Sequence, residues 1–116
     1  MTGTLLIYIQ DEHTRDTLKG TLCNYIPLIV TEDTPQCLEA LKQRSPVSKA
    51  IIGVSGMDDD DIADIIHSML EIKPELKIIA LGDKNSEDLA INAVRYGANG
   101  YILLPIKADE LLATLR

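Results

Sequence analysis

Ala50-Ile51-Ile52-Gly53-Val54 is a run of five residues without a polar side chain near the middle of the chain. Short apolar runs that lack polar alternation are typical of strands covered on both faces in a parallel sheet. Comparable runs lie on either side of it in the sequence. They are Leu5–Ile9, Ile78–Leu81, Tyr101–Leu104 and a weaker one, Leu28–Thr31, which follows Pro27. The sequence therefore predicts five buried strands.

Segments with the helical spacing of apolar side chains separate these strands. We expect helices over residues 12–24, from Thr34 to before Pro46, from the acidic run at Asp58 to before Pro74, over residues 86–96, and from Lys107 onward. Thr34 is the predicted N-cap of the second helix, with Pro35 at its first helical position, and Gly97 is the predicted stop of the fourth. Strands that alternate with helices in this way predict one α/β domain with an open, doubly wound parallel sheet.

The composition and charge of the chain argue against several classes of function. The 116 residues suit a single globular domain, and the net charge of -7 argues against direct contact with nucleic acid or anionic lipid. No apolar run is long enough to cross a bilayer, and no basic segment precedes the first apolar run as in a signal peptide. Cys23 and Cys37 are predicted to be buried free thiols in helices, which favours the reducing cytoplasm.

The segment Gly97-Ala98-Asn99-Gly100-Tyr101-Ile102-Leu103-Leu104-Pro105 resembles the Gly-Ala-x-x-Tyr/Phe-x-x-Lys-Pro segment of receiver domains, the phosphorylated domains of bacterial two-component response regulators. The resemblance extends over the whole chain. It includes Leu5–Ile9 with Arg15 and Leu18, residues 31–33 ahead of the second helix, and residues 72–75 ahead of the fourth strand. It implies a flavodoxin-like fold with strand order 2-1-3-4-5 and a site at the carboxyl ends of the strands.

The receiver reaction moves a phosphoryl group from a kinase histidine to an aspartate, and the resemblance assigns each position that this reaction needs. The acidic pair that holds Mg²⁺ is replaced by Ile9 and Gln10. The acceptor aspartate falls on Gly53 or Val54. Gly82 stands at the hydroxyl position and Leu104 at the lysine position. Because none of these side chains supplies the required chemistry, we expect a pseudo-receiver that is not an enzyme and has no metal or cofactor.

Alternative positions for this chemistry exist in the sequence. Asp11-Glu12 becomes the acidic pair if the alignment slips by two residues. The second hypothesis is an active receiver that accepts the phosphoryl group on a displaced aspartate, either Asp11 or one of Asp58–Asp61. Asp58–Asp61 would be a displaced acceptor or metal site, or would cap the third helix, which is the reading we favour. A third hypothesis is a small-molecule site in the apolar space that Gly53, Gly82 and Leu104 leave. His13 and His67 are predicted to be exposed and without function.

The predicted function is a phosphorylation-independent signalling module that binds another protein or a second copy of itself. The resemblance places the partner surface on the fourth helix, fifth strand and fifth helix. The candidate contact residues are Tyr96, Tyr101, Leu103 and Ile106. Because the last helix is short, we expect a domain cut from a longer regulator of transcription, whose output module would follow Arg116.

Overall fold

The computed structural model describes residues 3–43, 47–105 and 107–115. Strands and helices alternate along these residues. They are β1 (Thr4–Tyr8), α1 (Glu12–Leu22), β2 (Leu28–Thr31), α2 (Thr34–Lys42), β3 (Val47–Gly53), α3 (Asp59–Ile72), β4 (Lys77–Asp83), α4 (Glu87–Arg95), β5 (Gly100–Leu104) and α5 (Ala108–Leu115). The strands form one parallel sheet in the order β2-β1-β3-β4-β5, which confirms the predicted flavodoxin-like topology.

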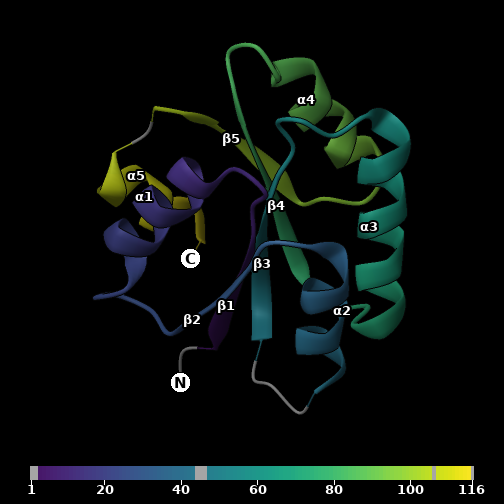
Figure 1. Cartoon of the computed structure of the whole chain (residues 1–116), viewed down its shortest axis with the longest axis horizontal. Helices are drawn as coiled ribbons and strands as arrows, with labels where there is room; N and C mark the ends of the chain where they lie inside the picture. Colours follow the sequence, from purple (N-terminus) through teal and green to yellow (C-terminus); the bar gives the residue numbers. More distant parts are fainter. Residues whose placement is uncertain (1–2, 44–46, 106, 116) are drawn as a thin grey trace.

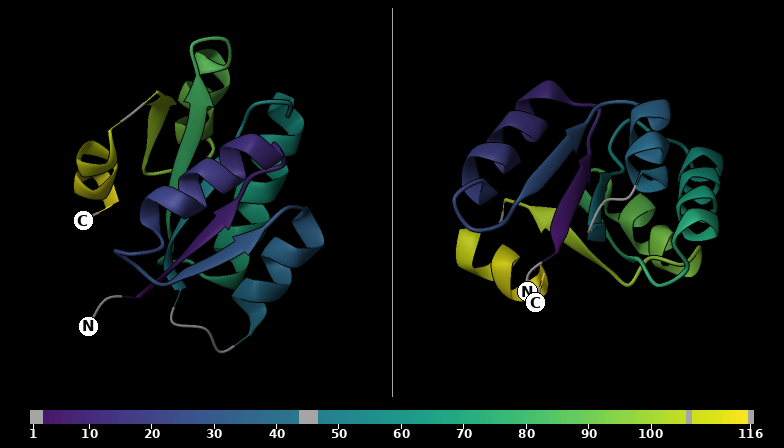
Figure 2. Two further views of the ribbon diagram at one scale, coloured as in Figure 1. Left: turned by 60° about the vertical axis from the view of Figure 1, so that its left-hand side comes forward. Right: turned by 90° about the horizontal axis from the view of Figure 1, so that it is seen from below.

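Helices cover both faces of the sheet. Figure 1 shows α1 and α5 on one side of it and α2, α3 and α4 on the other, and the two views of Figure 2 agree. Successive residues of β3 alternate between the two cores: Ala50 and Ile52 pack toward α2, α3 and α4, whereas Ile51 packs toward α1 and α5. Since both faces are buried, each strand needs apolar residues at consecutive positions, as the sequence has them.

α2 and α3 each begin at an aspartate whose carboxylate accepts a hydrogen bond from the backbone of the first turn. Asp33, not Thr34 as predicted, caps α2: its carboxylate accepts from the Gln36 amide at 2.9 Å, and Thr34 is already helical. An ionised carboxylate is the stronger acceptor for the positive end of a helix. Asp58 caps α3 as predicted, with its carboxylate 2.8 Å from the Asp61 amide nitrogen.

Some element boundaries and one burial prediction need correction. β3 begins at Val47 and β4 continues to Asp83, so both central strands are longer than their apolar runs. α1 ends at Leu22, which leaves Cys23 exposed rather than buried. Cys37 is buried in α2, and burial raises the pKa of its thiol to about 12. No helix in the described part of the chain is long and apolar enough to cross a membrane.

Gly97 ends α4 as predicted, and the backbone shows why a glycine is needed there. Its φ of 128° lies in a region that residues with a Cβ rarely adopt. The Gly97 amide donates to the Val94 oxygen at 3.2 Å, and the Ala98 amide donates to the Ala93 oxygen at 3.0 Å. These two hydrogen bonds form a Schellman motif, which turns the chain from α4 directly into β5.

We expect Gly97→Ala to lower the free energy of unfolding by about 2 kcal/mol, because the strained backbone would be retained. A Cβ at this position would also lie 2.9 Å from Leu70 Cδ1 in α3. Urea denaturation followed by circular dichroism measures the change. Gly20→Ala is the matched control: a Cβ on this α1 residue meets nothing within 4 Å, and alanine should stabilise the helix by about 0.5–1 kcal/mol. Equal effects of both substitutions would contradict the assignment.

Candidate functional site

A pocket of about 180 Å³ opens at the carboxyl ends of β1, β3, β4 and β5. It is called the cleft below. Its lining residues are Ile9, Gln10, Asp11, Thr14, Gly53, Ser55, Leu81, Gly82, Asp83 and Leu104. The four parallel strands thus bring together the predicted acidic-pair, acceptor, hydroxyl and lysine positions. Of the two candidates for the acceptor position, Gly53 lines the cleft, whereas Val54 is buried in the core beside α3 and α4.

The Ile9 side chain lies directly over Gly53. Ile9 is 2% exposed, and a Cβ built on Gly53 would be 3.2 Å from both Ile9 Cγ1 and Ile9 Cγ2. That distance is shorter than ordinary van der Waals contact between carbon atoms. The space in which a side chain at position 53 would begin is therefore filled with hydrocarbon.

Gln10 and Arg15 fix the loop that follows β1. The Gln10 amide nitrogen donates to the Tyr8 hydroxyl at 3.3 Å, and that hydroxyl is 2.9 Å from Thr34 Oγ1. Arg15 donates through Nη1 to the backbone oxygens of Ile9 and Gln10, at 3.1 and 3.3 Å. Its Nη2 lies 3.3 Å from Glu32 Oε2. A guanidinium therefore holds the backbone of this loop, and the Ile9 side chain with it.

Gly82 has a hydroxyl beside it, although not its own. Ser86, at the start of α4, is buried, and its Oγ lies 3.0 Å from the place of a Gly82 Cβ. Ser86 Oγ donates to Asp83 Oδ1 at 3.0 Å and accepts from the Asp83 amide at 2.9 Å. The predicted apolar space is thus partly occupied, by Ile9 beside Gly53 and by Ser86 beside Gly82.

Asp83 is a cleft residue that the sequence analysis missed. Its Oδ1 accepts from the amides of Asn85 and Ser86, at 2.9 and 3.0 Å, and so shapes the turn between β4 and α4. The sequence does place an acidic residue here, because Asp83 and Gly82 directly follow the apolar run Ile78–Leu81. The Asp83 carboxylate stabilises this turn. Its position is not among those that the receiver reaction uses, so the comparison with the family did not point to it.

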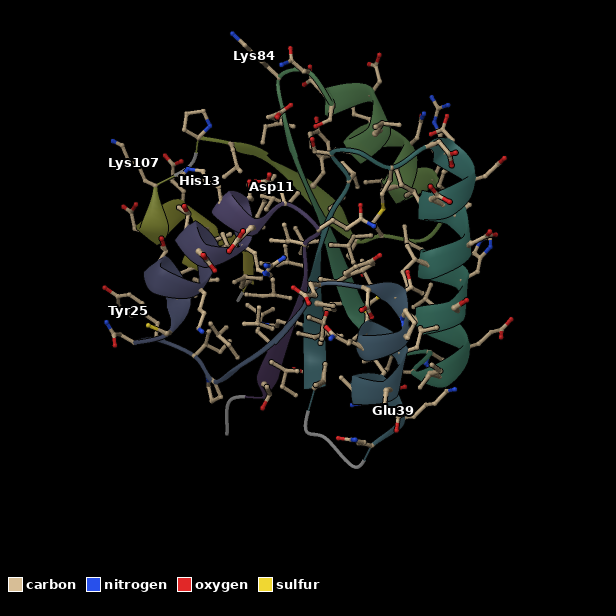
Figure 3. The ribbon with its side chains drawn as sticks, viewed as in Figure 1. Asp11, His13, Tyr25, Glu39, Lys84 and Lys107 are labelled. Carbon is tan, nitrogen blue, oxygen red and sulfur yellow. The ribbon has the colours of Figure 1, made fainter. Side chains whose placement is uncertain are left out.

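The displaced carboxylates are occupied as caps. Asp11 lines the cleft, but its Oδ2 accepts from the Thr14 hydroxyl at 2.7 Å and from the Thr14 amide at 2.8 Å. These hydrogen bonds, the side-chain one first, hold the pKa of the Asp11 carboxyl below its ordinary value of 3.8. Glu12 begins α1, exposed and outside the cleft lining. Figure 3 shows Asp11 and His13 at this end of α1.

The acidic run lies on α3 and not in the cleft. Asp58 caps the helix, and Asp59 accepts from the Asn92 amide nitrogen of α4 at 3.1 Å. Asp61 lines a neighbouring pocket of about 320 Å³ beside Tyr8, which shares Gln10 with the cleft. Among the residues that the structure describes, no three His, Cys, Asp or Glu side chains form a group that could hold a metal ion.

The predicted partner residues lie at the β5 edge of the sheet. Tyr101 is 42% exposed, whereas Tyr96 and Leu103 are half-buried against the core beside α3 and α4. Ile106 lies outside the described residues. Val94, on α4, is also exposed and was not among the predicted contacts. His13 and His67 are both exposed, as predicted.

No protein-family model matches the chain, and no curated protein does. Solved structures do match it. NtrX from Brucella abortus superposes with a TM-score of 0.85 at 24% identity, over 99% of this chain and 26% of the NtrX chain. The separate receiver domain of NtrX gives 0.82 at 24% identity, over 96% of this chain and 93% of that one. The CheY-like protein TadZ from Pseudomonas aeruginosa gives 0.81 at 20% identity, over 99% and 98%.

These structural neighbours are receiver domains of response regulators, and the chain has their fold. It spans about a quarter of the length of the NtrX chain. The superposition therefore supports the assignment of the fold, while the side chains in the cleft belong to this sequence alone.

The contact between Ile9 and Gly53 predicts a coupled effect on stability. We expect Gly53→Ala to lower the free energy of unfolding by about 1 kcal/mol, because the new methyl group overpacks against Ile9. In an Ile9→Ala background the same substitution should cost less, which gives a favourable coupling energy of about 0.5 kcal/mol or more. Urea denaturation of the four proteins of the double-mutant cycle measures it.

Gly100→Ala is the matched control for this cycle. Gly100 is also a strand glycine, but the nearest atom to its Cβ position is Ile79 Cδ1 at the ordinary distance of 3.8 Å. We expect no coupling between Gly100→Ala and Ile9→Ala. Additive effects of Gly53→Ala and Ile9→Ala would show that Ile9 does not restrict position 53.

Proposed function

We propose that the chain is a pseudo-receiver: a signalling domain that acts by binding protein without accepting a phosphoryl group. The observation that carries the proposal is the position of Ile9, which packs at 3.2 Å against the Cβ position of Gly53 at the end of β3. An acceptor carboxylate cannot be placed there without moving a buried isoleucine. Hydrocarbon thus replaces both one metal ligand and the room for the nucleophile.

Phosphoryl transfer to a carboxylate needs a metal ion or cationic groups to neutralise the charge that develops on the phosphoryl oxygens. Leu104 supplies no cation at the lysine position, and Gly82 supplies no hydroxyl. Arg15 is nearby, but its guanidinium is engaged with two backbone oxygens and with Glu32. A phosphoryl group brought to the cleft would meet the carboxylates of Asp11 and Asp83 without a compensating cation among the lining residues.

Incubation of the protein with Mg²⁺ and acetyl phosphate tests this proposal directly. We expect the intact mass of the present chain to remain unchanged. The receiver domain of NtrX is treated in parallel as the reference, and its gain of one phosphoryl group would show that the conditions permit phosphorylation. A stoichiometric gain by the present chain would overturn the proposal. Asp11→Asn, Asp83→Asn and variants of Asp58–Asp61 would then locate the acceptor.

We further propose that the chain associates with a second copy through the surface formed by α4 and β5. β5 is an edge strand, and its outer backbone groups are open to pairing. Val94 and Tyr101 are two of the large apolar side chains that are exposed in the described part of the chain, and both belong to this surface. Aromatic side chains at such positions are enriched among the residues that dominate binding energy.

Sedimentation velocity over a range of protein concentrations tests the self-association. We expect a monomer–dimer equilibrium that Tyr101→Ala weakens by about thirtyfold, the lower limit of a hot-spot effect. Tyr25→Ala is the matched control, because Tyr25 is 65% exposed and precedes β2 at the opposite edge of the sheet. A protein that remains monomeric at all concentrations, or equal effects of the two substitutions, would contradict this surface.

A further inference from the structure

A further pocket, of about 260 Å³, opens at the amino ends of β3, β4 and β5, at the other end of these strands from the cleft. The right-hand view of Figure 2 looks at the molecule from this end, with α5 beside β5. Its lining residues are Lys49, Lys77, Ile79, Asn99, Gly100, Tyr101, Thr114 and Leu115. It is called the lysine pocket below, and it shares no lining residue with the cleft.

Two ammonium groups stand on neighbouring strands in this pocket. Lys49 and Lys77 are register partners in the β3–β4 pair, so they leave the same face of the sheet side by side. Like charges at such positions destabilise a sheet. Within the described part of the chain neither lysine has an acidic partner, since the ion pair found there joins Arg15 to Glu32. The pair remains uncompensated in a chain whose net charge is -7.

The residues around the two lysines leave space for a ligand and provide a further hydrogen-bond donor. Gly100 carries no side chain, and the nearest atom to its Cβ position is Ile79 Cδ1 at 3.8 Å. Asn99 accepts through Oδ1 from the Ile78 amide at 2.9 Å, which orients its amide group and leaves the Nδ2 donor for another acceptor. Lys73 differs from the pair, because its ammonium donates to the backbone oxygen of Val47.

We propose that the lysine pocket binds the phosphate or carboxylate group of a small anionic ligand. Two ammonium groups on neighbouring strands favour an anion that carries two negative charges or a pair of oxygens. Charge-assisted hydrogen bonds of this kind are stronger than those between neutral groups. Binding would also remove the repulsion between Lys49 and Lys77. The site adds to the proposed function and does not depend on the chemistry of the cleft, with which it shares no lining residue. It adjoins the surface formed by α4 and β5, because Tyr101 belongs to both.

Titrations of the whole chain followed by NMR of the backbone amides test the proposal. Inorganic phosphate is one probe and succinate the other, each at constant ionic strength with sodium chloride as the reference salt. We expect saturable shifts at Lys49, Lys77, Asn99 and Gly100 with at least one probe. Saturation by phosphate alone assigns a phosphate-bearing ligand, and saturation by succinate alone assigns a dicarboxylate.

Charge-matched variants separate a site from general attraction. Lys49→Gln or Lys77→Gln should weaken the binding by about tenfold, the loss expected for one hydrogen bond to a charged group. Lys84→Gln and Lys107→Gln remove the same charge at the opposite end of the molecule (Figure 3) and should leave the affinity unchanged. Thermal melts establish that each variant is folded. Shifts that do not saturate, that chloride reproduces, or that all four variants weaken equally would overturn the proposal.

Discussion

The fold depends on one constraint: a parallel sheet must be buried on both faces. This requirement explains why the strands are nearly continuous apolar runs and why helices lie on both sides of the sheet. It also determines where function can be located. Side chains within the strands are committed to the two cores, so polar groups can gather only at the ends of the strands. The cleft lies at the carboxyl ends and the lysine pocket at the amino ends.

The fold could be predicted from the sequence because its signals are local and repeated. Apolar runs predicted the strands, and Gly97 and Pro74 predicted where helices end. The caps were harder, because neighbouring residues such as Asp33 and Thr34 can both supply an oxygen, and only the backbone conformation decides between them. Cys23 was misplaced for a similar reason. α1 ends one residue before it, which turns a buried helical position into an exposed one.

The site could be predicted only in part. The resemblance to receiver domains placed Ile9, Gly53, Gly82 and Leu104 at related positions, and the structure brings these residues together around one cleft. The contacts among them could not be predicted from the sequence. Ile9 and Gly53 are remote in sequence, and the contact of Ser86 with Gly82 depends on the shape of a turn. The paired lysines were missed for the same reason: Lys49 and Lys77 become neighbours only through the register of β3 and β4.

The residues at the cleft positions are consistent with one another in charge and in volume. Carboxylates crowded at the ends of adjacent strands repel one another unless a cation is bound, and a receiver accepts that cost because the metal ion takes part in its reaction. In the pseudo-receiver that we propose, a glycine stands at the acceptor position and a metal ion would serve no reaction there. The buried Ile9 then places no charge at this point and adds apolar contact with the core. Ile9 and Gly53 are therefore complementary, since the Ile9 side chain lies 3.2 Å from the place that a Cβ at position 53 would take. The two carboxylates that line the cleft each stabilise the start of a helix. Asp11 accepts from Thr14 in the first turn of α1, and Asp83 accepts from the amides of the turn that precedes α4. A receiver would instead use acidic groups at this end of the sheet to bind a cation.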